Sequence, residues 1–188
     1  MKKFLYTLLL AVLITGVAVP PTFACSPAPT GCPSNPCTEY VLNVDFSQHC
    51  GWTYYGQAGE ATGSAMCNVF STYAAFGYNG ISSPQAYQYV TLPTVSDTHW
   101  TVGYNVEVSD PHLSTSNHLG VYVYDTTTSS YLYYGPLFYG TDDPSCRNFQ
   151  GTWSGSLSGH TLLVGVYCSI VNSDTHFYIT ELGVWSNA

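Results

Sequence analysis

Positive charge is scarce in this sequence: three Lys and Arg residues stand against 11 Asp and Glu residues among 188. Two of the three are Lys2 and Lys3, so Arg147 is the one cation in the remainder of the chain. Proteins that bind nucleic acids neutralise phosphates with Lys and Arg, and anionic membrane surfaces attract the same side chains. The composition therefore argues against both partners. It fits a neutral partner such as a polysaccharide, or simply an acidic surface that keeps a secreted protein soluble.

Helical periodicity is also missing, because no window carries apolar residues at a sustained spacing of about 3.6 residues. Short runs of β-branched and aromatic residues between turn residues predict an all-β sandwich or barrel, and the lack of an internal repeat excludes a propeller. Two closing runs, 161–170 and 176–185, are joined by a polar turn and are expected to pair as an antiparallel hairpin. The other expected strands cover residues 39–45, 52–56, 66–70, 73–78, 86–92, 100–108, 118–125, 131–134, 137–140 and 147–153.

Catalytic signatures are absent as well. The sequence has no Gly-x-Ser-x-Gly elbow and no Gly-rich phosphate loop. The neighbouring carboxylates Asp142 and Asp143 point apart and do not form the facing pair of a glycoside hydrolase. Asp110, His112 and His118 are a weak candidate for a zinc or copper site in a metal-dependent hydrolase. We therefore expect a protein that is not an enzyme.

The first 24 residues have the three-part layout of a secretory signal peptide. Lys2 and Lys3 precede an apolar run that ends near Val19, and two prolines and the boundary Thr-Phe-Ala follow up to Ala24. The apolar run is short of the roughly 20 residues needed to span a bilayer, which disfavours a retained anchor. Residues 25–37 contain four prolines and predict a linker or stapled cap, and the domain proper is expected from residue 38 to 188. The chain is therefore expected outside the cell or on its surface.

Seven cysteines follow the predicted cleavage site, and in an oxidising compartment they indicate disulfides. Cys25 lies directly after the boundary, where a bacterial lipoprotein carries its lipidated cysteine, although Phe23 fits that motif poorly. Pairing of Cys25 with a neighbouring cysteine is the alternative. For the remaining six cysteines we expect local pairs, although six cysteines allow 15 connectivities. These pairs are Cys32–Cys37, Cys50–Cys67 and Cys146–Cys168.

Four segments together resemble the carbohydrate-binding-module-type jelly roll, a galactose-binding-like β-sandwich of secreted bacterial proteins. They are NVDFS at 43–47 with Gly51-Trp52 after it, AYQYVTLP at 86–93, the strand at 102–108, and the closing pattern from 153 to 185. The resemblance implies an antiparallel jelly-roll β-sandwich that binds a glycan. In this family a structural calcium is often held by a first-strand Glu and a last-strand Asp. Ser47 and Thr180 occupy those places here, which leaves Asp45 and Glu181 as weak calcium candidates.

Alternation along the expected strands selects the candidate carbohydrate-binding residues. Tyr122, Tyr124 and Tyr167 fall opposite the core-facing phase, and Asn105 and Glu107 are expected as their hydrogen-bonding neighbours. Flat aromatic rings suit the C–H faces of sugars. Alternatively, these rings face inward or only form cross-strand pairs, and Tyr87 and Tyr89 share that ambiguity. Trp100 and Trp153 are expected in the core or at its rim.

The first hypothesis is therefore a secreted, non-catalytic carbohydrate-binding module. The second is a structural or adhesive protein of the cell envelope, anchored by a lipid on Cys25, whose tyrosines pack on another protein.

Overall fold

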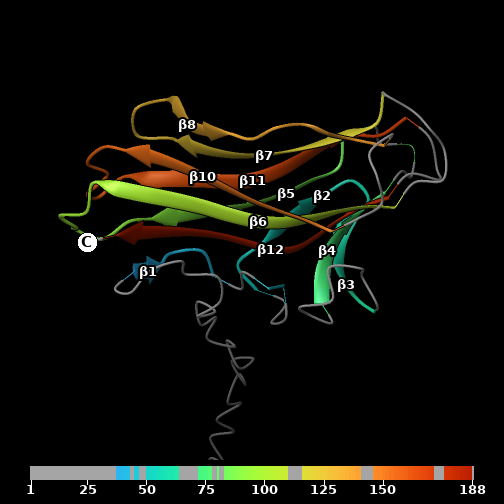
Figure 1. The fold of residues 1–188 in the computed structure, drawn as a ribbon, viewed down its shortest axis with the longest axis horizontal. Coiled ribbons are helices and arrows are strands. Elements are labelled where there is room, and N and C mark those ends of the chain that lie inside the picture. Colours follow the sequence, from blue (N-terminus) through green and yellow to red (C-terminus); the bar gives the residue numbers. More distant parts are fainter. Residues whose placement is uncertain are drawn as a thin grey trace, which may run out of the picture.

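The computed structural model describes residues 37–42, 45–46, 50–63, 72–77, 80, 83–109, 116–140, 146–171 and 176–187. Within these ranges the chain forms strands, turns and loops without a helix, so the described part has no helix that could cross a membrane. The strands form two antiparallel sheets (Figure 1). The prediction of an all-β, antiparallel sandwich in a single domain is confirmed.

Sheet A has the strand order β10–β6–β12–β4–β3, with β1 paired to β12. Its strands are β1 (Cys37–Glu39), β3 (Ala58–Thr62), β4 (Thr72–Phe76), β6 (His99–Ser109), β10 (Arg147–Ser154) and β12 (His176–Asn187). Sheet B has the order β2–β5–β11–β7–β8, with β9 paired to β7. Its strands are β2 (Thr53–Tyr55), β5 (Gln85–Thr91), β7 (His118–Asp125), β8 (Ser130–Tyr134), β9 (Phe138–Tyr139) and β11 (Thr161–Ser169).

The core lies between the two sheets and follows the period-two pattern of the sequence. All residues of β6 from Trp100 to Val108 are buried, and every second one, starting with Trp100, belongs to the hydrophobic core. Leu162, Val164 and Val166 of β11 are fully buried on the facing sheet. Burial of such side chains, at about 25 cal/mol per Å² of apolar surface, is the main force that holds two sheets together. Trp100 is 1% exposed and Trp153 packs against the core, as predicted.

The predicted closing hairpin is wrong. Strand β11 lies in sheet B between β5 and β7, whereas β12 lies in sheet A between β6 and β4. The chain therefore crosses from one sheet to the other between these strands. Two apolar strands joined by a short turn give the same local pattern whether they pair or cross, and here each strand pairs with neighbours that are distant in sequence.

The expected strand at 39–45 overlaps the observed β1 only at Glu39. Tyr40 N still donates to Val184 O, but the next two amides bond to side chains and leave the ladder: Val41 N donates to Glu39 Oε1 at 2.8 Å, and Leu42 N donates to Gln88 Oε1 at 2.8 Å. Strand β3 was not predicted, since Ala58–Thr62 is rich in residues that disfavour strands. The expected strand at 66–70 lies outside the described residues.

One of the three predicted disulfides is wrong. Cys168 is a free thiol on the core side of β11, and burial raises its pKa. Cys146 therefore does not pair with it, although Cys50 and Cys146 are both disulfide-bonded. Cys32 and Cys67 lie outside the described residues, so the pairs Cys32–Cys37 and Cys50–Cys67 stay predictions. So do the signal peptide and lipidation of Cys25.

Candidate functional site

The outer face of sheet B is covered with tyrosines. We call this surface the tyrosine face and define it by nine residues: Tyr55, Tyr87, Tyr89, Tyr122, Tyr124, Tyr131, Tyr134, Tyr139 and Tyr167. All are half-buried or exposed, and those on β5, β7 and β11 alternate with buried residues along their strands. Tyr89 and Tyr131 are the most exposed at 62% each.

Strand register arranges these tyrosines in rows across the sheet. One row runs from Tyr89 through Leu163 and Tyr124 to Tyr131. The next runs from Tyr87 through Gly165 and Tyr122 to Tyr134. At about 4.8 Å between strands, a row across these four strands is roughly 14 Å long. The face is therefore long enough to hold several rings of an extended chain.

Glycines on neighbouring strands make room for two of the rings. A Cβ on Gly165 would lie 2.5 Å from the Cζ and Oη atoms of Tyr122, which is the residue opposite it in the register. In the same way, a Cβ on Gly120 would lie 2.5 Å from Cε1 of Tyr167. Each ring therefore lies against the sheet, over the backbone of the glycine on the partner strand. Aromatic rings opposite glycines are a known way to cover exposed strand backbone.

Edge-to-face contacts join the rings into one layer. The ring of Tyr131 contacts Tyr124, Tyr134 and Tyr122, with centroids 4.9, 5.6 and 6.2 Å apart. Tyr134 continues to Tyr167, at 5.7 Å and with a hydrogen bond between their hydroxyls. Burial, followed by the neighbouring phenols, raises the pKa of Tyr122 to about 12. The Tyr122 phenol therefore stays neutral at physiological pH and acts as a hydrogen-bond donor and acceptor.

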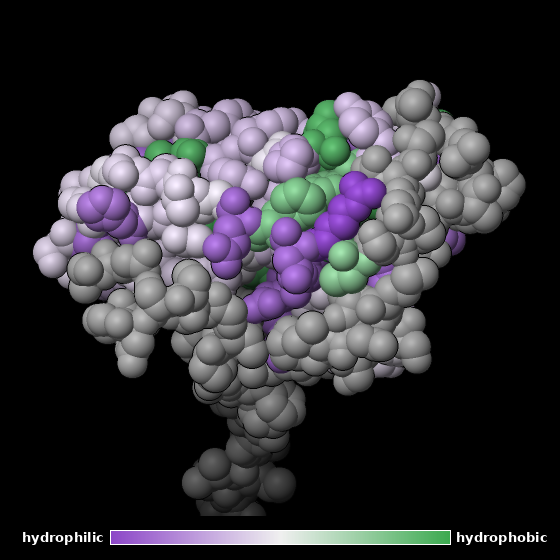
Figure 2. Space-filling model, viewed as in Figure 1, coloured by the Kyte–Doolittle hydropathy of each residue, from purple (hydrophilic) through white to green (hydrophobic). Residues whose placement is uncertain are grey.

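No charged side chain belongs to the rows of this face among the described residues. The positions between the tyrosines hold Thr91, Thr161, Leu163, Gln85, the two glycines and His118, whose ring contacts Tyr139 and Tyr167. Tyrosine combines an apolar ring with a polar tip, so this face is amphipathic. Figure 2 shows one face of the molecule, in which strongly hydrophilic residues lie beside small hydrophobic patches near the centre and pale residues lie around them.

Three of the predicted site residues lie together as expected. Tyr122, Tyr124 and Tyr167 point away from the core on adjacent strands, and the rings of Tyr122 and Tyr167 are 6.3 Å apart. Their role in binding stays a proposal. Tyr87 and Tyr89 also belong to this face.

The predicted position of Asn105 and Glu107 beside the tyrosines is wrong. Both lie on β6 of sheet A and are only 9% and 4% exposed. Asn105 Nδ2 donates to Glu181 Oε2 at 3.1 Å across the β6–β12 pair. Alternation along a strand correctly placed them away from the core, but it does not say in which sheet the strand lies.

The calcium candidates do not form a site in the described part of the chain. No group of three or more His, Cys, Asp or Glu side chains there could hold a metal ion. Calcium needs six to eight oxygen ligands, usually with several carboxylates among them. Asp45 and Glu181 thus do not fit a calcium ion in the described part of the chain, and we derive no calcium chemistry from them. Of the alternative metal candidates, Asp110 and His112 lie outside the described residues. His118 begins β7, and its ring contacts Tyr139 and Tyr167.

Sequence reasoning missed the tyrosines of the β8 hairpin strand. Tyr131 and Tyr134 lie on one face although they are three residues apart, because the register shifts between Val123 and Tyr124 on the partner strand. A β-bulge of this kind breaks the alternation that identifies a face. The available signal was the density of tyrosines in the segment SYLYY.

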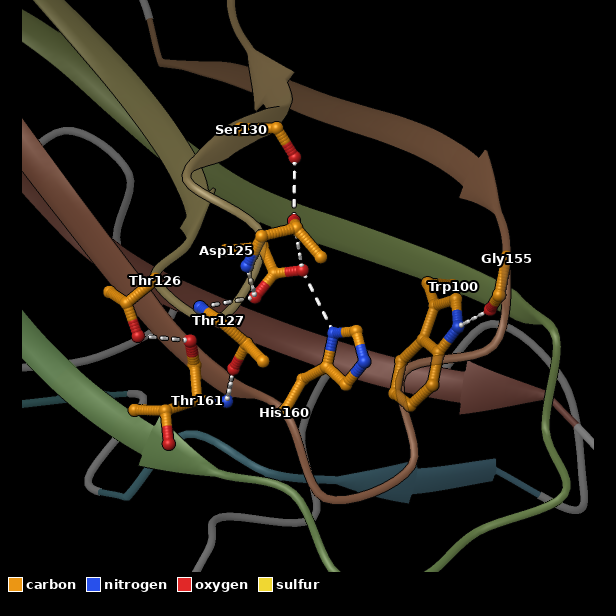
Figure 3. A network of polar contacts seen from close by, with 9 residues as sticks. Trp100, Asp125, Thr126, Thr127, Ser130, Gly155, His160 and Thr161 are labelled. Carbon is orange, nitrogen blue, oxygen red and sulfur yellow. Dashed lines mark hydrogen bonds and ion pairs between the residues drawn. The ribbon is translucent and has the colours of Figure 1, made fainter.

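A network of polar contacts holds the β7–β8 turn against the β10–β11 turn (Figure 3). Asp125 is buried, and its carboxylate accepts hydrogen bonds from Thr128 Oγ1 at 2.6 Å, His160 Nδ1 at 2.8 Å and Thr127 N at 2.9 Å. Thr126 N and Oγ1 both donate to Thr161 O. The hairpin that carries Tyr124 and Tyr131 is therefore fixed at its tip. Although burial opposes it, this set of hydrogen bonds keeps the pKa of Asp125 below its ordinary value.

Replacing Asp125 with Asn is expected to destabilise the fold at neutral pH by about 1–3 kcal/mol, because the amide nitrogen cannot accept from Thr128 and His160. A lowered pKa means that the carboxylate contributes stability above its unfolded pKa and loses it as pH falls. The difference from wild type should therefore shrink near pH 3. Urea unfolding at both pH values measures it. Ser130→Ala, which removes only an outer contact to Thr128, is the control, and an equal effect of both variants would contradict the network.

Several solved structures share this fold, and two of them contain a bound sugar. TmCBM61, solved in complex with β-1,4-galactotriose, matches with a TM-score of 0.59 and 13% identity over 80% of this chain and 99% of that one. The enzymatically active domain of tailspike protein 4 of bacteriophage CBA120 matches at 0.53 with 10% identity over 79% of this chain. Arabinose-bound MgGH51 α-L-arabinofuranosidase matches at 0.50 with 14% identity over 79% of this chain.

The match covers different shares of these proteins. It covers 21% of the tailspike chain and 26% of the arabinofuranosidase chain, whereas it covers nearly all of TmCBM61. No protein-family model and no curated protein sequence matches the chain. At these identities the likeness concerns the fold. The two antiparallel sheets and the match along nearly the whole of TmCBM61 together show that the chain has the β-sandwich fold of the carbohydrate-binding modules.

Proposed function

We propose that the chain is a secreted, non-catalytic carbohydrate-binding module that holds a neutral polysaccharide on the tyrosine face. The observation that carries the proposal is the uncharged layer of nine tyrosines on one face of a rigid sheet. Rings that recline on the sheet offer flat apolar surfaces to the C–H faces of sugars, and their hydroxyls offer hydrogen bonds to sugar hydroxyls. That a protein of the same fold was solved with a galactotriose supports a glycan as the partner.

The tyrosine face lacks the chemistry of a glycoside hydrolase. Such an enzyme needs two carboxyl groups about 5–10 Å apart that flank the scissile bond. The described rows of this face contain no Asp or Glu. Asp125 lies at the end of β7, but its carboxylate is buried and engaged with Thr127, Thr128 and His160. These observations support binding without catalysis.

Affinity electrophoresis tests the proposal. Native gels that contain galactan, xylan, arabinan or a mixed-linkage glucan should retard the wild-type protein with at least one polymer. Tyr122→Ala should weaken retardation by about tenfold, because it removes a ring from the centre of the layer. Gln150→Ala changes an exposed residue of β10 on the opposite sheet and should leave retardation unchanged. Equal migration of all three proteins with every polymer would refute the proposal.

The second candidate function is an envelope protein whose tyrosine face packs on another protein. The position of Cys25 directly after the predicted cleavage site favours it, because that is where bacterial lipoproteins are acylated. A diacylglyceryl mass on Cys25 of the mature chain, measured by mass spectrometry, would support this candidate. An unmodified mature N-terminus would count against it.

A further inference from the structure

A small pocket lies at the β3–β4 end of sheet A, away from the tyrosine face. Its volume is about 270 Å³, and Gly59, Ala75 and Gly77 are among the residues that line it. In the register Ala75 pairs with Gly59 on one side and with Tyr178 on the other. Tyr178 points away from the core, since it alternates with buried Phe177 and Ile179. This row of the pocket therefore opens on the outer face of sheet A.

The space exists because two residues of that row, Gly59 and Ala75, have no side chain or only a methyl group. A Cβ on Gly59 would meet no atom within 4 Å, which marks open space directly above the backbone. Ala75 adds only a methyl group beside it. A volume below the roughly 300–1,000 Å³ of sites for drug-sized molecules suits a ligand of a single ring.

Two planar polar side chains converge at one end of the pocket. A Cβ on Gly77 would lie 3.2 Å from His176 Cδ2 and 3.3 Å from Gln57 Cδ, so both side chains lean over this glycine. Gly77 N donates to Gln57 O at 2.9 Å, which fixes the backbone there. An amide and an imidazole provide donors and acceptors for neighbouring hydroxyl groups.

An aromatic stack borders the same end. The rings of His176 and Tyr178 are nearly parallel, with an interplanar angle of 16° and centroids 6.4 Å apart. Glu60 also lines the pocket, and its carboxylate accepts a hydrogen bond from Tyr54 Oη at 3.2 Å. The pocket thus combines a flat apolar border, hydrogen-bonding groups and little charge.

We propose that this pocket is a second carbohydrate site, one that takes a single neutral sugar ring. The amide of Gln57 and the imidazole of His176 bind its hydroxyls, and the stacked rings border its apolar face. The site lies on the other sheet from the tyrosine face, so either proposal can fail while the other holds. Together the two sites would let one domain contact two parts of a polysaccharide, or two chains.

Saturation-transfer difference NMR on the intact mature protein tests the pocket. The probes are methyl β-galactopyranoside, methyl β-xylopyranoside and L-arabinose. Wild type should show saturation transfer to at least one of them. Gly59→Phe should reduce that signal by about tenfold, since the new ring fills the open space over a backbone that is not strained. Gly59→Ala is the matched control and should keep most of the signal.

The outcomes separate the two sites. Loss of the monosaccharide signal in Gly59→Phe with unchanged polysaccharide retardation is the expected result, and Tyr122→Ala should show the reverse. No saturation transfer from the wild type to any probe, or an equal signal in Gly59→Phe, would overturn the pocket proposal. Far-UV circular dichroism of each variant confirms that the fold is retained, and Gln57→Ala provides a second variant at the polar end.

Discussion

Replacing Glu39 with Gln is expected to leave stability nearly unchanged at about pH 4 and to raise it by on the order of 4 kcal/mol at about pH 9. Burial raises the pKa of Glu39 from its ordinary value of 4.5 to about 8, and the nearby Glu181 adds to the effect. A raised pKa means that the folded state favours the protonated acid. Wild-type stability should therefore be greatest below about pH 4.5 and decrease as pH rises to about 8.

The structure explains why Gln is a suitable replacement. Oε1 of Glu39 accepts hydrogen bonds from three backbone amides, those of Tyr40, Val41 and Val184, at 2.9, 2.8 and 3.0 Å. A Gln carbonyl oxygen keeps all three. Oε2 is buried and accepts no hydrogen bond within the described residues, so the carboxylate charge gains little there. Gln is the neutral analogue of the protonated acid, and it removes the cost of burying a charge.

Urea unfolding midpoints of wild type and Glu39→Gln between about pH 4 and pH 9 measure this effect. Asp125→Asn is the matched control, because its pKa shift has the opposite sign and its penalty should grow as pH rises from acid to neutral. Wild-type stability that rises steadily from pH 5 to pH 8 would contradict a buried protonated Glu39.

Replacing Gly165 with Val is expected to abolish most polysaccharide binding while every tyrosine of the face remains. The added side chain would collide with the ring of Tyr122, whose Oη lies 2.5 Å from an ideal Cβ at this position. The far end of the Tyr122 side chain is the part that moves, so the ring is lifted off the sheet. We expect a loss of about tenfold or more in affinity, equal to about 1.4 kcal/mol.

A double-mutant cycle isolates this effect. If Gly165 acts through the ring of Tyr122, then Tyr122→Ala and Tyr122→Ala/Gly165→Val bind equally, and the two substitutions are strongly non-additive. Isothermal titration with the polymer that retards the wild type provides the affinities. Additive losses would mean that the introduced valine side chain obstructs the ligand directly and that ring orientation is unimportant.

The sequence was sufficient for the fold class because each strand of the sandwich carries its own alternating pattern. His118–Asp125 was predicted with the bounds that the structure has, since its apolar phase is uninterrupted. Strand β3 was missed because Ala58 and Gly59 contribute no apolar side chain that marks a face. The sheet to which each strand belongs could not be predicted from the sequence, because local patterns do not encode distant partners. The crossing from β11 in sheet B to β12 in sheet A is an example.

The candidate site was predicted in part for the same reason. Tyr122, Tyr124 and Tyr167 lie on strands with regular alternation, so their face could be read from the sequence. Asn105 has an equally regular strand but belongs to the other sheet, and Tyr131 follows an irregularity in register. The free thiol of Cys168 likewise depends on a three-dimensional fact, namely that its side chain faces the core.

The two glycines under the tyrosine rings also bear on the thermodynamics of binding. Gly120 and Gly165 make room for the two rings on the sheet, and contacts with neighbouring rings order these side chains before any ligand arrives. Ordering a mobile side chain on association commonly costs about 0.5–1.5 kcal/mol, and here that cost is met during folding. Under the proposed function, a long flexible polymer would be held by a few shallow contacts and released quickly, so that the face could exchange among many equivalent positions along one chain.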